Sequence, residues 1–165
     1  MLVPSVLAKP LDFAPLALIE HFASRIFDRV LKIHPDLFER LGDYRSKRFC
    51  FSPSDLPLHF VVIPEARMVK VSRGIRQPAA DAAISGPLLL LLALLEGRCD
   101  GDALFFSRDL MVTGEIEAML ALRNALDDSV IDLTADLGGM TGPLAPLVTR
   151  TARHIRSHAL RGKAL

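Results

Sequence analysis

Two histidines four residues apart, His154 and His158, have a spacing that would let both bind one metal ion from the same face of a helix. A zinc protease motif also needs a glutamate and a third ligand, and the sequence supplies neither in this pattern. Arginines surround the pair instead. We therefore interpret the two histidines as exposed side chains of a basic helix and expect no metal site.

The candidate nucleophiles are two cysteines, Cys50 and Cys99. They have no CxxC spacing, and the sequence assigns a general base to neither of them. We interpret both as core or partly buried thiols of a reduced, cytoplasmic protein. A thiol-dependent or acyl-transfer activity would rest on these two residues alone.

Other catalytic patterns are weak or absent. Asp127 and Asp128 could act as an acid and a base, but adjacent carboxylates at a helix end usually form a solvated cap. The pair Gly138-Gly139 lacks the lysine of a phosphate-binding loop, and no GxSxG motif is present. The sequence therefore predicts no catalytic residues and no cofactor, and we expect that the protein is not an enzyme.

Apolar residues carry the stronger signal. The chain has 165 residues, enough for one domain with a real core, and half of them are hydrophobic, with a mean hydropathy of +0.31. A net charge of +1 gives no global field for nucleic acid. The aliphatic run at 88–95 would span about 12 Å as a helix, far less than a bilayer core of about 30 Å. It is either a buried core helix or the wall of an apolar cavity.

The elements that position these residues follow from hydrophobic periodicity, which predicts an α+β fold. Apolar residues recur at helical spacing in the N-terminal part, and short runs rich in valine and aromatic residues follow, separated by proline or glycine. Short connections between the first three strands favour antiparallel neighbours. The predicted helices are 15–31, 35–41, 87–96, 114–127 and 144–161, and the predicted strands are 47–51, 58–63, 68–72, 80–85 and 110–113.

A recognisable pattern lies at the last predicted strand, where the run Leu-Phe-Phe-Ser-Arg-Asp-Leu at 104–110 leads to Gly114-Glu115 at the start of a helix. This pattern resembles the sterol carrier protein type 2 (SCP2-like) superfamily, and within it the family of bacterial ubiquinone-biosynthesis accessory factors typified by UbiT. Arg108 and Glu115 match the family pattern. The resemblance covers about residues 45–133. The N-terminal helix and the basic tail match the family only in their general character.

The resemblance implies a five-stranded, mainly antiparallel sheet packed with helices around an apolar tunnel. It also implies a non-catalytic, lipid-binding role in oxygen-independent ubiquinone biosynthesis, alongside the peptidase-like proteins UbiU and UbiV. Polyprenylated quinone precursors would be held for the modifying enzymes at the inner membrane. The chain would divide into an N-terminal helical segment at 1–43, the lipid-binding domain at 44–137 and a basic amphipathic helix at 138–165.

Two sets of binding residues are expected on this basis. The predicted lipid-binding residues are the apolar side chains Phe60, Val62, Leu88, Leu91, Leu92, Leu95, Phe105, Phe106, Leu110, Met119 and Leu122. The tail is basic and amphipathic, which is typical of a helix that lies on an anionic membrane surface or binds a partner. Its apolar residues could equally pack on the core of the domain, which would leave the basic face in solvent. Its predicted membrane-binding residues are Arg150, Arg153, Arg156 and Arg161.

Two other functions remain open. The same apolar residues could pack into a closed core, in which case the protein would be a scaffold that recruits biosynthetic enzymes without binding lipid. The protein could also be a general carrier of fatty acids or phospholipids. A sizeable cavity in the fold would separate a carrier from a scaffold.

Overall fold

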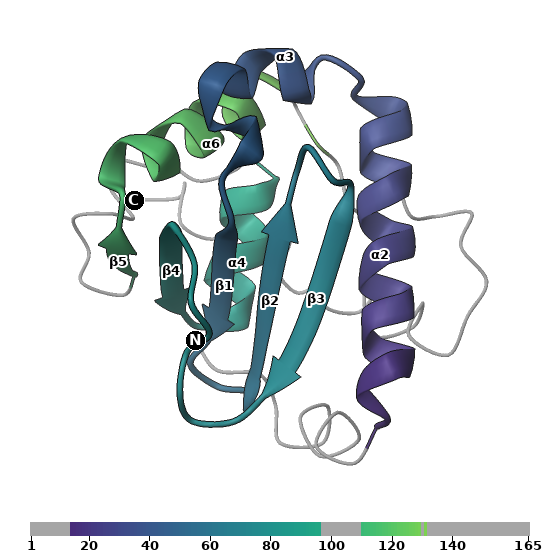
Figure 1. Ribbon diagram of the computed structural model, residues 1–165, viewed down its shortest axis with the longest axis vertical. Helices are drawn as coiled ribbons and strands as arrows, with labels where there is room; N and C mark the ends of the chain where they lie inside the picture. The colour runs from purple at the N-terminus through teal and green to yellow at the C-terminus, as the bar shows by residue number, and fades with distance from the viewer. Residues whose placement is uncertain (1–13, 97–109, 130, 132–165) are drawn as a thin grey trace, which may run out of the picture.

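The computed structural model describes residues 14–96, 110–129 and 131, and their elements form an α+β fold (Figure 1). Every helix and strand predicted within these ranges is present, with its ends within two residues of the prediction. The helices are α2 (Leu16–Ile33), α3 (Leu37–Leu41), the 3₁₀ helix η1 (Gly42–Ser46), α4 (Leu88–Leu95) and α6 (Ile116–Ser129). The strands are β1 (Phe49–Pro53), β2 (Leu58–Ile63), β3 (Met68–Arg73), β4 (Ala82–Gly86) and β5 (Met111–Gly114).

The five strands form one sheet in the order β3-β2-β1-β4-β5. All neighbouring pairs are antiparallel except β1 and β4, which run parallel with Phe49 opposite Ala82. The predicted mainly antiparallel, five-stranded sheet is therefore confirmed. Because β3 and β4 run in the same direction, the connection at 74–81 has to carry the chain back along the height of the sheet (Figure 1).

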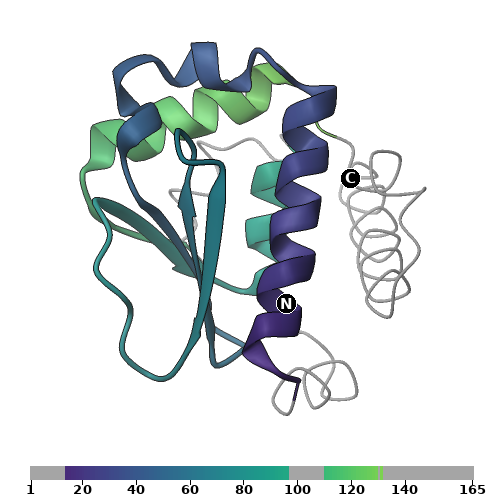
Figure 2. The ribbon, with the colours of Figure 1, turned by 45° about the vertical axis from the view of Figure 1, so that its right-hand side comes forward.

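Different elements pack against the two faces of the sheet. Helices α2 and α4 lie against one face, and α6 crosses its upper end (Figure 2). Phe49 of β1 belongs to the large core cluster on this helix side, together with residues of α4 and α6. Successive side chains of a strand point to opposite faces, so Cys50 lies on the other face, where it packs with Val61 and Ala83. Ala80 of the connection covers this small cluster.

Helix α2 covers the edge strand β3. It begins after Pro15, whose φ of −56° suits the start of a helix, and it ends at His34 before Pro35. The carboxylate of Glu20 accepts a hydrogen bond of 2.8 Å from the backbone N–H of Val71 in β3. This bond satisfies a donor at the sheet edge that has no strand partner, which protects the edge from pairing with other chains.

Helix α4 is the leucine run, and it is buried on more than one side. Leu89, Leu91, Ala93 and Leu94 are buried, although these positions do not share one helix face. Leu91 and Leu94 belong to the main core, whereas Leu89 and Ala93 form a separate small cluster. Among the described residues, no helix combines the length and the apolar character needed to cross a bilayer.

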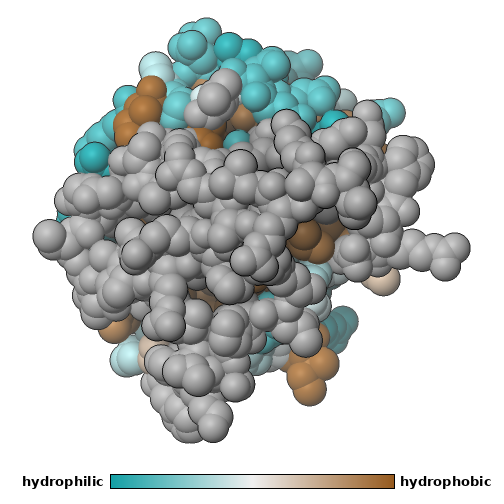
Figure 3. All heavy atoms as spheres, turned by 180° about the vertical axis from the view of Figure 1, so that it is seen from behind, coloured by the Kyte–Doolittle hydropathy of each residue, from teal (hydrophilic) through white to brown (hydrophobic). Residues whose placement is uncertain are grey.

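Surface ion pairs join the elements at the upper end of the molecule. Lys47 contacts Glu115 at the start of α6 at 2.8 Å, and Arg40 of α3 contacts Asp128 of α6 at the same distance. Seen from behind in Figure 3, hydrophilic side chains of the described residues gather at this end, over α3 and the adjoining helix ends. Strand β1 begins at Phe49, later than predicted, because the backbone N–H of Arg48 donates to the Asp81 carboxylate at 2.7 Å.

This contact gives a pH-dependent contribution to stability. The Arg48 backbone N–H, assisted by its side chain, holds the pKa of Asp81 below its ordinary value. A lowered pKa in the folded state stabilises the fold above the unfolded pKa of about 3.9, and this stabilisation is lost as the pH falls through the lower folded value. We expect Asp81→Asn to be less stable than the wild type at pH 7. The difference between their free energies of unfolding in urea should decrease below about pH 5. A difference that stays constant down to acid pH would contradict this account.

Some predictions fall outside the described residues. They are the helix at 144–161, the histidine pair His154 and His158, Cys99, and the lipid-binding residues Phe105 and Phe106. The membrane-binding residues Arg150, Arg153, Arg156 and Arg161 also lie there. The division at 43/44 and 137/138 stays a prediction.

Candidate functional site

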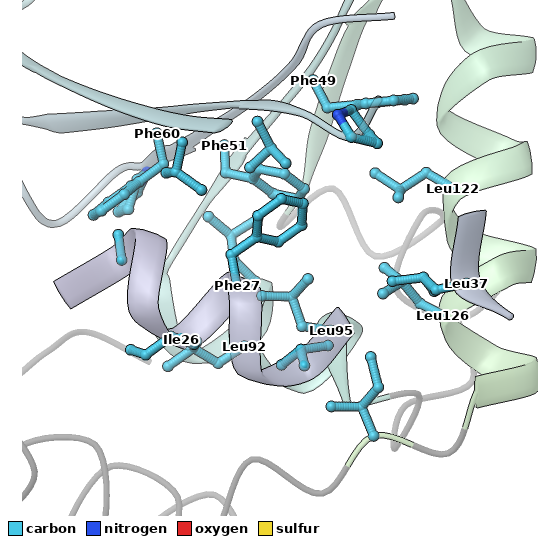
Figure 4. A pocket seen from close by; sticks show the side chains of 18 of the residues that line it. Ile26, Phe27, Leu37, Phe49, Phe51, Phe60, Leu92, Leu95, Leu122 and Leu126 are labelled. Atoms are coloured by element: carbon cyan, nitrogen blue, oxygen red, sulfur yellow. The ribbon is translucent and has the colours of Figure 1, made fainter. Parts of the chain in front are cut away.

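A cavity of about 250 Å³ lies between the helix-side face of the sheet and the helices (Figure 4). Every described residue that lines it is apolar: an alanine, valine, leucine, isoleucine, phenylalanine or proline. No charged or hydrogen-bonding side chain is among these lining residues. The cavity therefore offers burial to hydrocarbon and offers a polar group no side-chain partner.

Three neighbouring strands supply one wall. Phe49 and Phe51 alternate along β1, and the register places Phe51 opposite Phe60 and Phe49 opposite Val62 of β2. Val69 of β3 continues this wall, opposite Val62. Pairs that lie directly opposite on one face have side chains in contact range, so these residues form a continuous apolar surface.

The helices supply the other walls. Leu88, Leu91, Leu92 and Leu95 of α4 line the cavity at the spacing i, i+3, i+4 and i+7, which describes one helix face. On α2 the lining residues are Ala23, Ile26, Phe27 and Val30, and Leu122 and Leu126 of α6 close another side. Figure 4 shows the ring of Phe27 reaching from α2 toward Phe51 of the sheet. Leu37, Leu41, Pro53, Pro64 and Ile131 complete the lining.

Most of the predicted lipid-binding residues within the described ranges lie at this cavity. They are Phe60, Val62, Leu88, Leu91, Leu92, Leu95 and Leu122. Leu110 and Met119 are buried in the adjoining core and are not lining residues. Whether the lining residues bind lipid stays a prediction.

The sequence reasoning missed the contribution of α2 and of β1. Helical periodicity predicts α2, but the predicted division of the chain places this helix in a separate N-terminal segment at 1–43. A signal was available, because a helix with one apolar stripe must bury it against something, and the neighbouring strands were the nearest apolar surface.

The candidate catalytic residues that the structure describes lie away from the cavity. Cys50 is fully buried on the opposite face of the sheet, with its Sγ 3.5 Å from the hydroxyl of Ser52. Asp128 pairs with Arg40, and Asp127 pairs with Arg123 at 3.4 Å, so both carboxylates are engaged at the end of α6. Within the described ranges, no group of three or more His, Cys, Asp or Glu side chains could hold a metal ion.

Comparisons with known proteins show the fold and the family. The SCP2 domain of the ubiquinone synthesis protein UbiJ superimposes with a TM-score of 0.57 at 20% identity, covering 72% of this chain and 98% of that one. A sterol carrier protein domain 2 from Helicoverpa armigera gives a TM-score of 0.47 at 13% identity, covering 73% of this chain and 89% of its own. No curated protein sequence matches the chain significantly. The model of the SCP-2 sterol transfer family matches residues 27–127, which include all five strands, α4 and most of α6, and the chain therefore belongs to this family.

Proposed function

We propose that the protein is a non-catalytic lipid-binding accessory factor that holds the hydrophobic tail of a polyprenylated quinone precursor. The observation that carries this proposal is the cavity, whose described lining is entirely apolar. Its volume of about 250 Å³ exceeds the roughly 150 Å³ that suffices to bind benzene in an engineered apolar cavity. The cavity therefore has room for part of a hydrocarbon tail and leaves the polar head outside.

The affinity expected from such burial is useful without any polar contact. Each buried methylene contributes about 0.8 kcal/mol, so about ten carbon groups would contribute on the order of 8 kcal/mol. Part of this free energy offsets the loss of translational and conformational freedom on binding. A reversible complex is the expected result, and reversibility is what a carrier needs in order to deliver its lipid.

The pathway assignment has two supports. The sequence pattern from Leu104 to Glu115 resembles accessory factors of oxygen-independent ubiquinone biosynthesis, and the fold is shared with the UbiJ domain. In this role the protein would be cytoplasmic and peripherally associated with the inner membrane. It would present bound precursors to modifying enzymes and work together with UbiU and UbiV.

Lipid extraction tests this proposal. We expect organic solvent to release a polyprenylated phenol or quinone from protein purified out of a ubiquinone-producing host. Mass spectrometry should show that this compound is a larger fraction of the released lipid than of the total lipid of the host. Delipidated protein should take up octaprenylphenol in preference to palmitate or phosphatidylcholine. Equal uptake of all three would favour a general carrier. If no lipid is released and none binds on addition, the protein is not a carrier and the scaffold interpretation replaces this one.

A further inference from the structure

The end of β3 and the loop that follows it present an isoleucine between two arginines, and we call residues 73–76 the docking loop. Ile75 is 105% exposed, so it makes essentially no contact with the rest of the described protein. Arg73 and Arg76 on either side are also exposed. The sequence from 68 to 80 contains Lys70 and these two arginines and no acidic residue.

A buried polar network fixes the base of this loop. The carbonyl of Gly74 can only accept, so the ring Nε2–H of His59 donates to it, at 3.0 Å. The other ring nitrogen, Nδ1, forms a hydrogen bond of 2.8 Å with the Ser52 hydroxyl. The N–H of Gly74 also donates to the carbonyl of Pro57 at 3.2 Å. His59 and Ser52 are buried on the sheet face away from the cavity, so they anchor the loop and take no part in the cavity.

The charge around the docking loop differs from that at the other end of the sheet. At the upper end, Lys47 is paired with Glu115 and Arg48 with Asp81. At the lower end, where β3 finishes in Figure 1, Arg76 forms no ion pair within the described residues. The loop therefore presents positive charge and an aliphatic side chain together.

Arg73 links this end to the start of α2. Its guanidinium donates to the carbonyl of Ala14 at 2.9 Å, directly before the helix. Leu18 in the first turn of that helix is 42% exposed. The start of α2 thus adds a partly exposed aliphatic side chain to the lower end of the molecule.

We propose that the docking loop binds the protein to an anionic lipid bilayer, with Ile75 entering the acyl-chain boundary and Arg73 and Arg76 at the lipid phosphates. Aliphatic and basic side chains side by side are the two components of interfacial binding, since one gains from burial and the other from the negative surface potential. This contact rests on the proposed function in one respect, since it would bring the proposed lipid carrier to the membrane. It depends on neither the occupant of the cavity nor the basic tail.

A tryptophan probe tests the insertion of Ile75. The protein contains no tryptophan, so Ile75→Trp would give a single reporter without background. We expect its emission to shift to the blue with vesicles of phosphatidylcholine and phosphatidylglycerol, and much less with phosphatidylcholine alone. The matched control is Ile116→Trp, because Ile116 is 62% exposed at the opposite end of the sheet. Equal shifts for both reporters, or none for either, would overturn the proposal.

Vesicle flotation measures the contribution of each side chain. Ile75→Ser is expected to weaken partitioning about tenfold, since roughly 1.4 kcal/mol of burial is lost. Arg76→Glu should weaken it at least as much and reduce its salt dependence. Ile116→Ser and Arg25→Glu make the same chemical changes elsewhere and should leave partitioning unchanged. Circular dichroism should show all four variants folded, because the replaced residues are exposed.

The outcomes separate the docking loop from the cavity and from the tail. A variant whose cavity is filled should lose lipid binding and keep vesicle docking, so failure of one proposal does not mimic failure of the other. If substitution of Arg150, Arg153, Arg156 and Arg161 abolishes docking while Ile75→Ser and Arg76→Glu have no effect, the tail is the membrane contact and the present inference is wrong. Absence of wild-type binding to the anionic vesicles would also contradict it.

Discussion

Replacing Ala23 with phenylalanine is expected to weaken lipid binding by at least about a hundredfold while the protein stays folded. Ala23 lies on α2 and lines the cavity, so the new ring would enter the space that the lipid tail needs. A phenyl group is about as large as the benzene that fills an apolar cavity of roughly 150 Å³, and it would occupy most of the 250 Å³. Excluding at least about four methylenes from burial costs at least about 3 kcal/mol of binding, which corresponds to a loss of at least about a hundredfold.

The thermal stability of the lipid-free protein should be retained or raised by the same substitution. An empty apolar cavity leaves its lining without contacts on one side, and an added ring restores part of these dispersion contacts. We therefore expect the melting temperature of delipidated Ala23→Phe to equal or exceed that of the delipidated wild type. Displacement of a bound fluorescent fatty acid by octaprenylphenol would measure affinity, and thermal unfolding followed by circular dichroism would measure stability.

A matched control is available on the same helix. Ala17 is exposed on α2 and does not line the cavity, so Ala17→Phe introduces the same side chain without filling the space. Leu92→Trp approaches the cavity from α4 and provides a second blocking variant if Ala23→Phe is poorly folded. If both blocking variants fold and bind lipid as well as the wild type, the cavity is not the lipid site.

The elements of the fold were predictable because local periodicity determines them. The alternating and valine-rich runs of β2 and β3 and the uniformly apolar α4 carry their secondary structure in the sequence itself. The one parallel pair was not predicted, because the pairing of β1 with β4 depends on the route of the connection at 74–81 and not on either strand.

The cavity was only partly predictable, for a different physical reason. Periodicity shows which face of an element is buried, but it does not show whether that face meets packed atoms or empty space. Leu122 and Met119 of α6 are both buried, and only Leu122 lines the cavity. In β1, Phe49, Cys50 and Phe51 are all apolar, so the pattern does not indicate which of them point toward the helices.

The hydrogen bonds that anchor the docking loop could not be predicted from the sequence either. Ser52 and His59 lie on neighbouring strands and meet only because the β1–β2 turn aligns them. Gly74, which the other ring nitrogen of His59 contacts, follows a third strand. A hydrogen-bond network assembled from three separate segments leaves no local pattern, and only the folded sheet reveals it.

Gly114→Ala is expected to destabilise the fold by at least about 3 kcal/mol. Gly114 ends β5 with a φ of +81°, which is strained for any residue with a Cβ atom. An added Cβ would overlap the carbonyl oxygen of Asp81 and lie 3.2 Å from the Cα of Ala82. These are backbone atoms of the paired strand, and the Asp81 carbonyl already accepts the N–H of Glu115 at 2.8 Å. The clash can be relieved only by moving β5 and the start of α6 away from β4.

Gly42→Ala separates the effect of this close approach from that of the backbone angle. Gly42 has a φ of +53°, but nothing lies within 4 Å of a Cβ built there, so its substitution should cost only about 1–2 kcal/mol. The free energy of unfolding in urea should therefore fall by at least about 2 kcal/mol more for Gly114→Ala than for Gly42→Ala. Equal losses would mean that β5 and α6 can move away from β4 at little cost. In that case the strand-to-helix joint at Gly114 and Glu115 would be kept for its backbone angle alone, and the tight contact with Asp81 would not define the wall that α6 gives to the cavity.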